Sequence, residues 1–172
     1  DAFAEQRVYL LSMRADLSHK REHHEEALAA SVERIRICEE QFGEEHSKLL
    51  NALISHATLA CKIPGCPGGE ETARRAVSMA QSAGHESRLA DAWISLSETL
   101  RMKRQFRESE KALREAIAEV SLTKAETWRG MELHRRLGDL LTARSDCAAA
   151  LTEYETAARG WFDTTTSGRP PE

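Results

Sequence analysis

The sequence is poor in aromatic residues, prolines and glycines, and it has no long apolar run. Aromatic side chains make up 5% of the 172 residues, beside four prolines and nine glycines. No apolar run approaches the roughly 20 residues that a membrane-spanning helix needs, and no charged-then-apolar signal segment opens the chain. We therefore expect no membrane partner and a cytoplasmic location.

The charge is not dominated by one sign. The chain has 24 basic and 28 acidic residues, which are interspersed and give a formal net charge of -4. It lacks the long basic run that binds the phosphate backbone of nucleic acid, so we do not expect a nucleic-acid partner. Apolar residues at 41% and charged residues at 30% argue against disorder over the whole length.

The four cysteines do not form the pattern of a disulfide scaffold or a zinc site. They are scattered through a chain that is large enough to fold without cross-links, so reduced thiols are favoured. Cys61 and Cys66 are separated by four residues, a wider spacing than the two residues of a zinc knuckle, and no second cysteine pair follows. A local disulfide between them stays an alternative, although it would close a very short loop.

Signatures of enzymes and metal proteins are also missing. The sequence has no nucleophile elbow, phosphate-binding loop, dinucleotide-binding glycine motif or zinc-protease motif. His19 and His23 are four residues apart and could share a metal ion on a continuous helix, but the repeat described below puts them at a turn. We predict a non-enzymatic protein without metal or cofactor. A helical metalloprotein that uses His19, His23 and Cys61 is kept as an alternative.

Apolar residues recur at helical spacing almost throughout, and strand-type alternation is absent. Residues 107–120, for example, place Ala112 and Ala116 on an apolar stripe opposite charged residues. Gly43 and Gly84 stand where helix C-terminal caps are expected. The pattern predicts eight helices joined by short loops, at residues 2–18, 24–42, 47–62, 70–83, 87–103, 107–120, 124–143 and 147–162.

A sequence motif recurs along these helices. Its clearest copy contains Leu137, Gly138, Leu141, Ala150, Tyr154 and Ala157. These residues stand at the spacing of the tetratricopeptide repeat, in which W-x-x-L-G-x-x-Y is followed by A-x-x-x-F-x-x-A, so the chain resembles this family. Earlier copies contain Trp93, Leu96, Ser97, Leu100, Ser109, Leu113 and Ala116, and then Leu53, His56, Ala57, Ala60, Ala73, Val77 and Ala80.

The first copy of the motif is the poorest. Ala27 and Ser31 lie in its second helix, and its first helix can be aligned on either Leu10 or Leu11. The small residues of the four second helices, Ala27, Ala73, Ser109 and Ala150, are 46, 36 and 41 residues apart, against about 34 in the standard repeat. Residues 33–60 resemble the long repeats of kinesin light chains, in which the second helix ends in Leu-Gly and an acidic-His pair follows. Phe42, Gly43, Glu45 and His46 stand at these places.

The resemblance implies an all-α fold, a right-handed α-solenoid of about four antiparallel helical hairpins. Ala or Ser where two helices cross lets the backbones approach closely, and stacked hairpins cover the apolar face that one hairpin leaves open. We predict a repeat domain over residues 1–163 and a flexible polar tail over 164–172. The predicted hairpins are residues 1–43, 46–84, 87–121 and 124–162.

The loop LACKIPGCPGGEE at residues 59–71 holds two of the cysteines and two of the prolines. Pro64 cannot continue a helix, and the glycines from Gly65 to Gly69 favour a turn. It joins the two helices of the second hairpin and is about four residues longer than the motif requires. We interpret it as an enlarged turn at the edge of the groove.

In tetratricopeptide proteins the concave face is lined by the first helix of each hairpin, at positions two, five, nine and twelve of the motif. The resemblance places at these positions Asn51, Ile54, Thr58, Cys61, Asp91, Ile94, Glu98, Arg101, Glu132, Arg135, Asp139 and Thr142. All of these except Cys61 and Thr142 form our candidate partner-binding groove. The acids among them do not fit the cationic clamp that chaperone-binding members of the family use for a terminal carboxylate.

These observations predict a non-enzymatic protein-interaction module. Its partner would be a peptide or helix of another protein, or another region of its own parent chain, held in the concave groove. The alternative is a regulatory domain that senses a ligand or peptide within a larger signalling or transcription-regulating protein.

Overall fold

The computed structural model describes residues 2–82, 86–123 and 127–166, which form eight α-helices and no strand. The helices are α1 (Ala2–Lys20), α2 (His24–Phe42), α3 (Ser47–Cys61), α4 (Gly69–Ser82), α5 (Glu86–Met102), α6 (Phe106–Thr123), α7 (Thr127–Ala143) and α8 (Cys147–Thr166). The predicted all-α class is confirmed. Gly84, a predicted helix cap, and residues 167–172 of the predicted tail lie outside the described residues.

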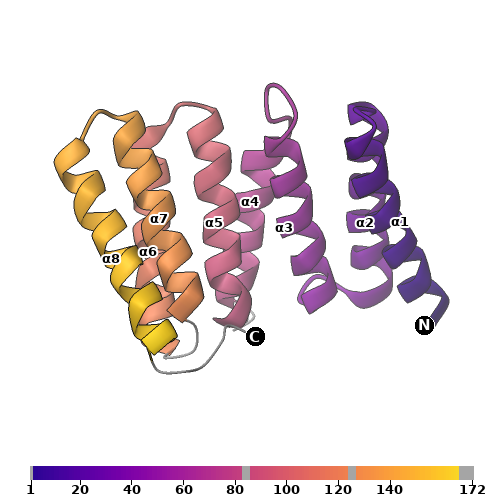
Figure 1. Cartoon of the computed structure of the whole chain (residues 1–172). Helices are drawn as coiled ribbons and strands as arrows, with labels where there is room; N and C mark the ends of the chain where they lie inside the picture. The colour runs from indigo at the N-terminus through magenta and orange to yellow at the C-terminus, as the bar shows by residue number, and fades with distance from the viewer. Residues whose placement is uncertain (1, 83–85, 124–126, 167–172) are drawn as a thin grey trace.

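The helices pack in chain order as four hairpins. The two helices of each hairpin contact each other, and α2, α4 and α6 contact the first helix of the next hairpin. In addition, α3 packs against α5. Figure 1 shows the result, a row of helices that runs across the molecule from α1 to α8. Contacts limited to near neighbours in the chain are typical of a solenoid, and the predicted architecture is confirmed.

One type of turn closes the first, third and fourth hairpins. Its left-handed residue is Glu22, Arg104 or Ser145, with φ between 62° and 65°. The next residue donates its backbone N–H to a carbonyl five residues back, from His23 to Ser18, from Gln105 to Leu100 and from Asp146 to Leu141, at 2.9 to 3.0 Å. This is the Schellman ending of an α-helix. Arg104 and Ser145 are 41 residues apart, and Glu22 and Arg104 are twice that distance apart, so the structural repeat is 41 residues long.

This repeat length resolves the alignment of the first hairpin. Counting back from the turns, Ala15 is the counterpart of Ser97 and Gly138, and Leu11 is the counterpart of Trp93. Leu11 packs into the core, as Trp93 does. Leu10 is 63% exposed, so the alternative alignment on Leu10 is excluded.

Small residues lie where the two helices of a hairpin cross. A Cβ atom on Gly138 would lie 2.6 Å from Cε1 of the Tyr154 ring, so the fourth hairpin has no space for one. In the third hairpin, the Ser109 hydroxyl donates a 2.8 Å hydrogen bond to the Ser97 carbonyl oxygen. The crossings therefore follow the close approach that the motif predicts.

The enlarged turn of the second hairpin begins after α3 ends at Cys61 and leads into α4 at Gly69. Gly65 and Cys66 take positive φ values, 84° and 47°, and reverse the chain. The Sγ atoms of Cys61 and Cys66 are 3.3 Å apart, and both thiols are free and buried. The loop is thus a turn packed around a thiol pair, within the second hairpin as predicted.

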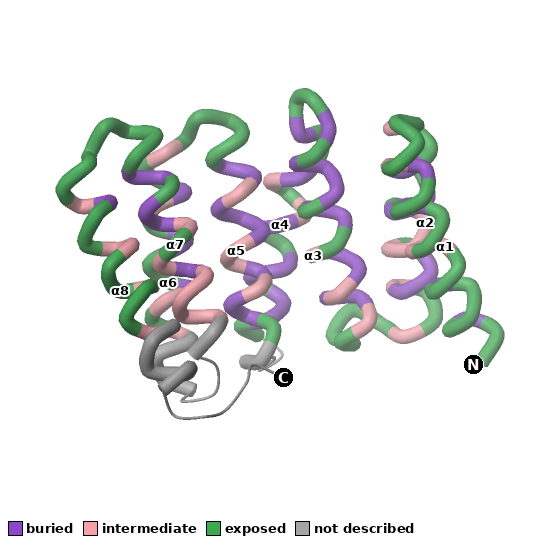
Figure 2. The backbone as a smooth tube through the Cα atoms, viewed as in Figure 1, coloured by how far each residue is buried: buried purple, intermediate pink, exposed green. Residues whose placement is uncertain are grey.

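The first hairpin leaves one apolar face exposed. Most of α1 is coloured as exposed in Figure 2, whereas α3 and α5 are largely buried. Leu10, Met13 and Leu17 lie on this face. Their counterparts three repeats later, on α7, are Leu133, Arg136 and Leu140. The two leucines are fully buried, and α7 packs against α6 of the preceding hairpin. The exposed face of α1 is therefore the face that later hairpins use for stacking.

Among the described residues, none of the helices has an apolar stretch long enough to cross a membrane.

Candidate partner-binding groove

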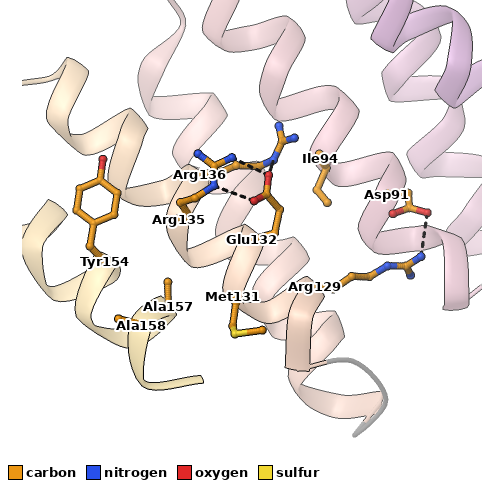
Figure 3. Close-up of a pocket in the computed structure, with 10 residues that line it drawn as sticks. All are labelled: Asp91, Ile94, Arg129, Met131, Glu132, Arg135, Arg136, Tyr154, Ala157 and Ala158. Atoms are coloured by element: carbon orange, nitrogen blue, oxygen red, sulfur yellow. Dashed lines mark hydrogen bonds and ion pairs between the residues drawn. The ribbon is translucent and has the colours of Figure 1, made fainter. Parts of the chain in front are cut away.

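A cavity with a volume of about 700 Å³ lies between α5, α7 and α8. We call it the main cavity. It is lined by Asp91, Ile94, Arg129, Met131, Glu132, Arg135, Arg136, Tyr154, Ala157 and Ala158. Figure 3 shows these side chains on three helices around the same space. Four of the candidate groove residues, Asp91, Ile94, Glu132 and Arg135, are among them.

A row of ion pairs follows the exposed side of α7. Arg135 contacts Glu132 at 2.8 Å and Asp139 at 2.7 Å. Arg136 reaches the same Glu132 carboxylate at 2.7 Å. Hydrogen bonds from Arg135 are the main cause that lowers the pKa of Glu132, and the carboxylates in turn raise the pKa of Arg135. The charges of this row are therefore fixed and mutually compensated.

The main cavity also has an apolar part and a bridge between helices. Arg129 on α7 forms an ion pair with Asp91 on α5 at 3.5 Å. Ile94 packs at the edge of the core, and Met131 and Ala157 add apolar surface from α7 and α8. An apolar floor beside paired charges is the usual composition of a binding pocket.

A second cavity of about 310 Å³, the central cavity, adjoins the main one and shares Arg135 and Arg136 with it. It contains three further candidate residues, Glu98, Arg101 and Asp139. Arg101 contacts Glu98 at 2.6 Å, and this hydrogen bond is the main cause that lowers the pKa of Glu98.

A third cavity of about 320 Å³, the first-hairpin cavity, lies between α1, α2 and α3. Asn51 is the one candidate residue that lines it. Its other lining residues are Glu5, Val8, Tyr9, Ser12, Arg34 and Lys48. Asn51 is therefore separated from the candidates on α5 and α7.

Two candidate residues, Ile54 and Thr58, are not among the residues that line these three cavities. Ile54 is half-buried and packs against the core. The Thr58 hydroxyl donates a 2.9 Å hydrogen bond to the Ile54 carbonyl oxygen on the same helix.

Sequence reasoning did not place the second helices in the groove, yet Tyr154 of α8 lines the main cavity. Its hydroxyl donates a 2.8 Å hydrogen bond to Asp139, so it holds one end of the charged row. The available signal was the Tyr in a motif position that usually holds Phe, because a packed phenol needs a hydrogen-bond partner. Arg129 and Arg136 were also missed, since Arg129 precedes the first groove position of the fourth copy and Arg136 falls between its second and third groove positions.

Within the described ranges, His, Cys, Asp and Glu side chains do not gather in groups of three or more that could hold a metal ion. His19 and His24 have their ring centroids 5.9 Å apart, and His23 is at the turn that precedes α2.

Comparison with known proteins supports the fold. Neither protein-family models nor the sequences of curated proteins match this chain. The structure is similar to a crystal structure of BtubC (BKLC) from P. vanneervenii, with a TM-score of 0.77 and 16% sequence identity. The match covers 96% of this chain and 66% of the BtubC chain, so this chain spans just under two thirds of that length. It also aligns with a MamA RS-1 ArsTM double mutant at 15% identity over 93% of this chain and 97% of that one, but the TM-score of 0.41 is too low to establish a shared fold.

BtubC is a kinesin light chain-like tetratricopeptide protein. The match, together with the 41-residue repeat of hairpin turns, shows that this chain has a tetratricopeptide-like α-solenoid fold.

Proposed function

We propose that this chain is a non-enzymatic protein-interaction module that binds a peptide or helix of a partner protein in the main cavity. The observation that carries the proposal is the main cavity itself, with its apolar floor at Ile94 and Met131 beside a row of paired charges on α7. The apolar floor supplies affinity, and the fixed charges supply specificity.

The charges favour a partner of mixed composition. The main and central cavities share Arg135 and Arg136, so together they form one strip along α5 and α7. The strip contains Asp91, Glu98, Glu132 and Asp139 together with Arg101, Arg129, Arg135 and Arg136. Equal numbers of acids and bases disfavour a strongly acidic or strongly basic partner, because either would meet like charges. A polar peptide with one or two apolar anchors fits best.

A second candidate function is a domain that senses a small ligand. The volume of about 700 Å³ favours it, because it lies within the range of small-molecule pockets. A sensing domain would bind the ligand without needing the central cavity, whereas a peptide would extend across both cavities.

The test is selection of binding peptides from a displayed random library, followed by affinity measurements with purified variants. Ala158→Trp fills the main cavity from an exposed position, and Arg135→Glu disrupts the charged row. The matched control is Arg114→Glu on α6, because Arg114 has the same kind of i, i+4 ion pair with Glu110 outside these cavities. We expect both cavity variants to lose roughly tenfold or more in affinity and the control to bind normally. Selected peptides that bind both cavity variants as tightly as the unaltered chain would contradict the proposal.

A further inference from the structure

Arg34 breaks the repeat at a position where the other hairpins have alanine. Seven residues after the small residue of each second helix, the later hairpins have Ala80, Ala116 and Ala157. Ala80 and Ala116 are almost fully buried. In the first hairpin the same position, seven residues after Ala27, is Arg34 on α2. A long cationic side chain thus occupies a position at which the later hairpins have a small one.

The Arg34 side chain lies in the first-hairpin cavity and has no partner there. Its Nε atom is buried without a hydrogen-bond acceptor, and no ion pair joins Arg34 to another described residue. Burial is the main cause that lowers the pKa of Arg34, while Cys38 and Asp16 act on it only through space. An arginine remains protonated at neutral pH even so, and the cavity therefore contains a partly desolvated cation that no carboxylate of the described residues contacts.

Two other arginines of the groove have carboxylate partners in direct contact. Arg101 contacts Glu98, and Arg135 contacts both Glu132 and Asp139. Leaving a buried donor or charge unpaired costs stability, and a protein retains such a cost mainly at a functional site. The missing partner of Arg34 is therefore an indication that an anion binds there.

The first-hairpin cavity is the structural counterpart of the main cavity. Val8, Tyr9, Ser12 and Arg34 line the former, and the residues three repeats later, Met131, Glu132, Arg135 and Ala157, line the latter. Each pair is separated by 123 residues, three times the 41-residue repeat (131 − 8 = 123). The first-hairpin cavity is thus the same groove surface at the other end of the solenoid, with an arginine where the main cavity has Ala157.

We infer that Arg34 is the anion-binding residue of the groove and takes one carboxylate group of the bound partner segment. A guanidinium can donate two parallel N–H hydrogen bonds to a carboxylate, and Ser12 and Asn51 line the same cavity as further polar contacts. The inference rests on the proposed function, in that the carboxylate belongs to a segment held in the groove.

The charge of the cavity selects a carboxylate over a phosphate. Arg34 and Lys48 are the cations of the lining, and Glu5 already forms an ion pair with Lys48. Among the lining residues one positive charge, that of Arg34, therefore remains without a contacting counter-charge, which suits a monoanion. A dianionic phosphate would leave excess negative charge beside Glu5.

The test observes the Arg34 Nε–H signal by NMR in the whole chain. Sodium acetate is titrated against sodium chloride at equal ionic strength, and inorganic phosphate is titrated in parallel. N-acetylglutamate α-amide and N-acetylglycine then separate a side-chain carboxylate from a terminal one. We expect a saturable shift with acetate and with one of the two amino-acid probes, and no saturable shift with chloride. Shifts with acetate no larger than those with chloride overturn the inference, and stronger binding of phosphate overturns its assignment to a carboxylate.

Variants test the role of Arg34 directly. Arg34→Ala installs the residue of the later hairpins, so the fold should be retained, and Arg34→Lys keeps the charge without the planar fork. Acetate binding, followed at the amide signals of Ser12 and Asn51, should weaken roughly tenfold in Arg34→Ala and clearly in Arg34→Lys. The matched control is Arg36→Ala on the same helix, which removes an exposed arginine paired with Glu33 and should bind as the unaltered chain does. Unchanged acetate binding in Arg34→Ala or, if that variant does not fold, in Arg34→Lys overturns the inference.

The outcome for this site is distinguishable from that for the groove as a whole. If library peptides bind the main cavity but Arg34→Ala has no effect on acetate, the proposed function stands and the anion site fails. If acetate binds at Arg34 but no peptide binds the main cavity, the anion site stands and the proposed function fails.

Discussion

Ser31 Oγ lies 2.7 Å from His56 Nδ1 and joins α2 to α3 inside the molecule. The Ser31 hydroxyl already donates its only proton to the Leu28 carbonyl oxygen at 2.8 Å. His56 is then the donor through its Nδ1–H, and the lowered pKa that burial gives this ring favours its neutral form. This hydrogen bond links the first hairpin to the second through a buried polar pair.

The buried ring of His56 predicts a pH-dependent stability. Burial lowers the pKa of His56, so the unfolded chain takes up this proton more readily than the folded chain. The stabilisation is complete above the unfolded pKa of about 6.5 and is lost as the pH falls below it. We expect the free energy of unfolding, measured with urea between pH 7.5 and 5.5, to fall by at most ~1.4 kcal/mol per pH unit.

The control for this prediction separates His56 from other groups. The lowered pKa values of Glu98 and Glu132 act in a more acidic range, since their unfolded pKa is 4.5. His56→Gln should flatten the dependence between pH 7.5 and 5.5, whereas replacement of the exposed His23 by Gln should leave it unchanged. An equal slope in both variants would assign the effect to another residue.

Removal of the acceptor should destabilise the chain without any loss of apolar contact. Ser31→Ala leaves the buried Nδ1–H of His56 without a partner, which costs about 1–3 kcal/mol. Ser82→Ala is the matched control, because the exposed Ser82 hydroxyl donates a hydrogen bond only to the Met79 carbonyl oxygen of the same helix. Urea unfolding at pH 7.5 measures both. A cost below ~0.5 kcal/mol for Ser31→Ala would show that the hydrogen bond contributes little.

The contact between Gly138 and the Tyr154 ring predicts that alanine is harmful at a helical glycine. Alanine normally stabilises a helix by roughly 1 kcal/mol relative to glycine, but here its Cβ would lie 2.6 Å from the ring. We expect Gly138→Ala to destabilise the chain by about 1–3 kcal/mol. At Gly160 the new methyl group would meet only the flexible side chain of Met131, so Gly160→Ala should be neutral or mildly stabilising. A stabilising Gly138→Ala would contradict the close crossing.

The sequence was sufficient to predict the helices and the stacking of the later hairpins. Helical periodicity sets the elements, and small residues such as Ser97 and Gly138 mark the crossings, which are both local properties of the chain. The first hairpin could not be aligned, because Arg14 stands where the motif has Leu. The left-handed turn at Glu22 determines the alignment of this hairpin, but a glutamate at that position does not predict a left-handed residue from sequence.

The candidate groove was predictable only in part. Positions on the first helices follow from the motif, and seven of the ten candidates line the main or central cavity. Arg34 and Tyr154 lie on second helices, at positions that the motif assigns to packing. Whether such a side chain is covered or open to a cavity depends on how neighbouring hairpins lie, which residue spacing does not specify.

Two leucines at the same repeat position should differ sharply in their importance. Leu17 on α1 is 50% exposed, and Leu140, three repeats later on α7, is fully buried. Leu140→Ala should cost about 2–5 kcal/mol, whereas Leu17→Ala should change the free energy of unfolding by less than ~0.5 kcal/mol. Urea unfolding of the two variants at low protein concentration measures the difference. A large cost at Leu17 would show that another surface covers α1 in solution.

The cysteines should differ in reactivity according to burial. Cys147 is exposed, whereas Cys38, Cys61 and Cys66 are buried. Burial is the main cause that raises the pKa of Cys61, and its hydrogen bond with Cys66 adds to the effect, so little thiolate is present at neutral pH. Mass spectrometry after brief iodoacetamide treatment should find one labelled thiol, at Cys147, and four after unfolding in urea under reducing conditions. Cys147→Ser should abolish the fast labelling. Labelling of Cys61 at a comparable rate in the folded chain would mean that the turn around the thiol pair opens readily, because a thiol reacts only when it is both accessible and deprotonated.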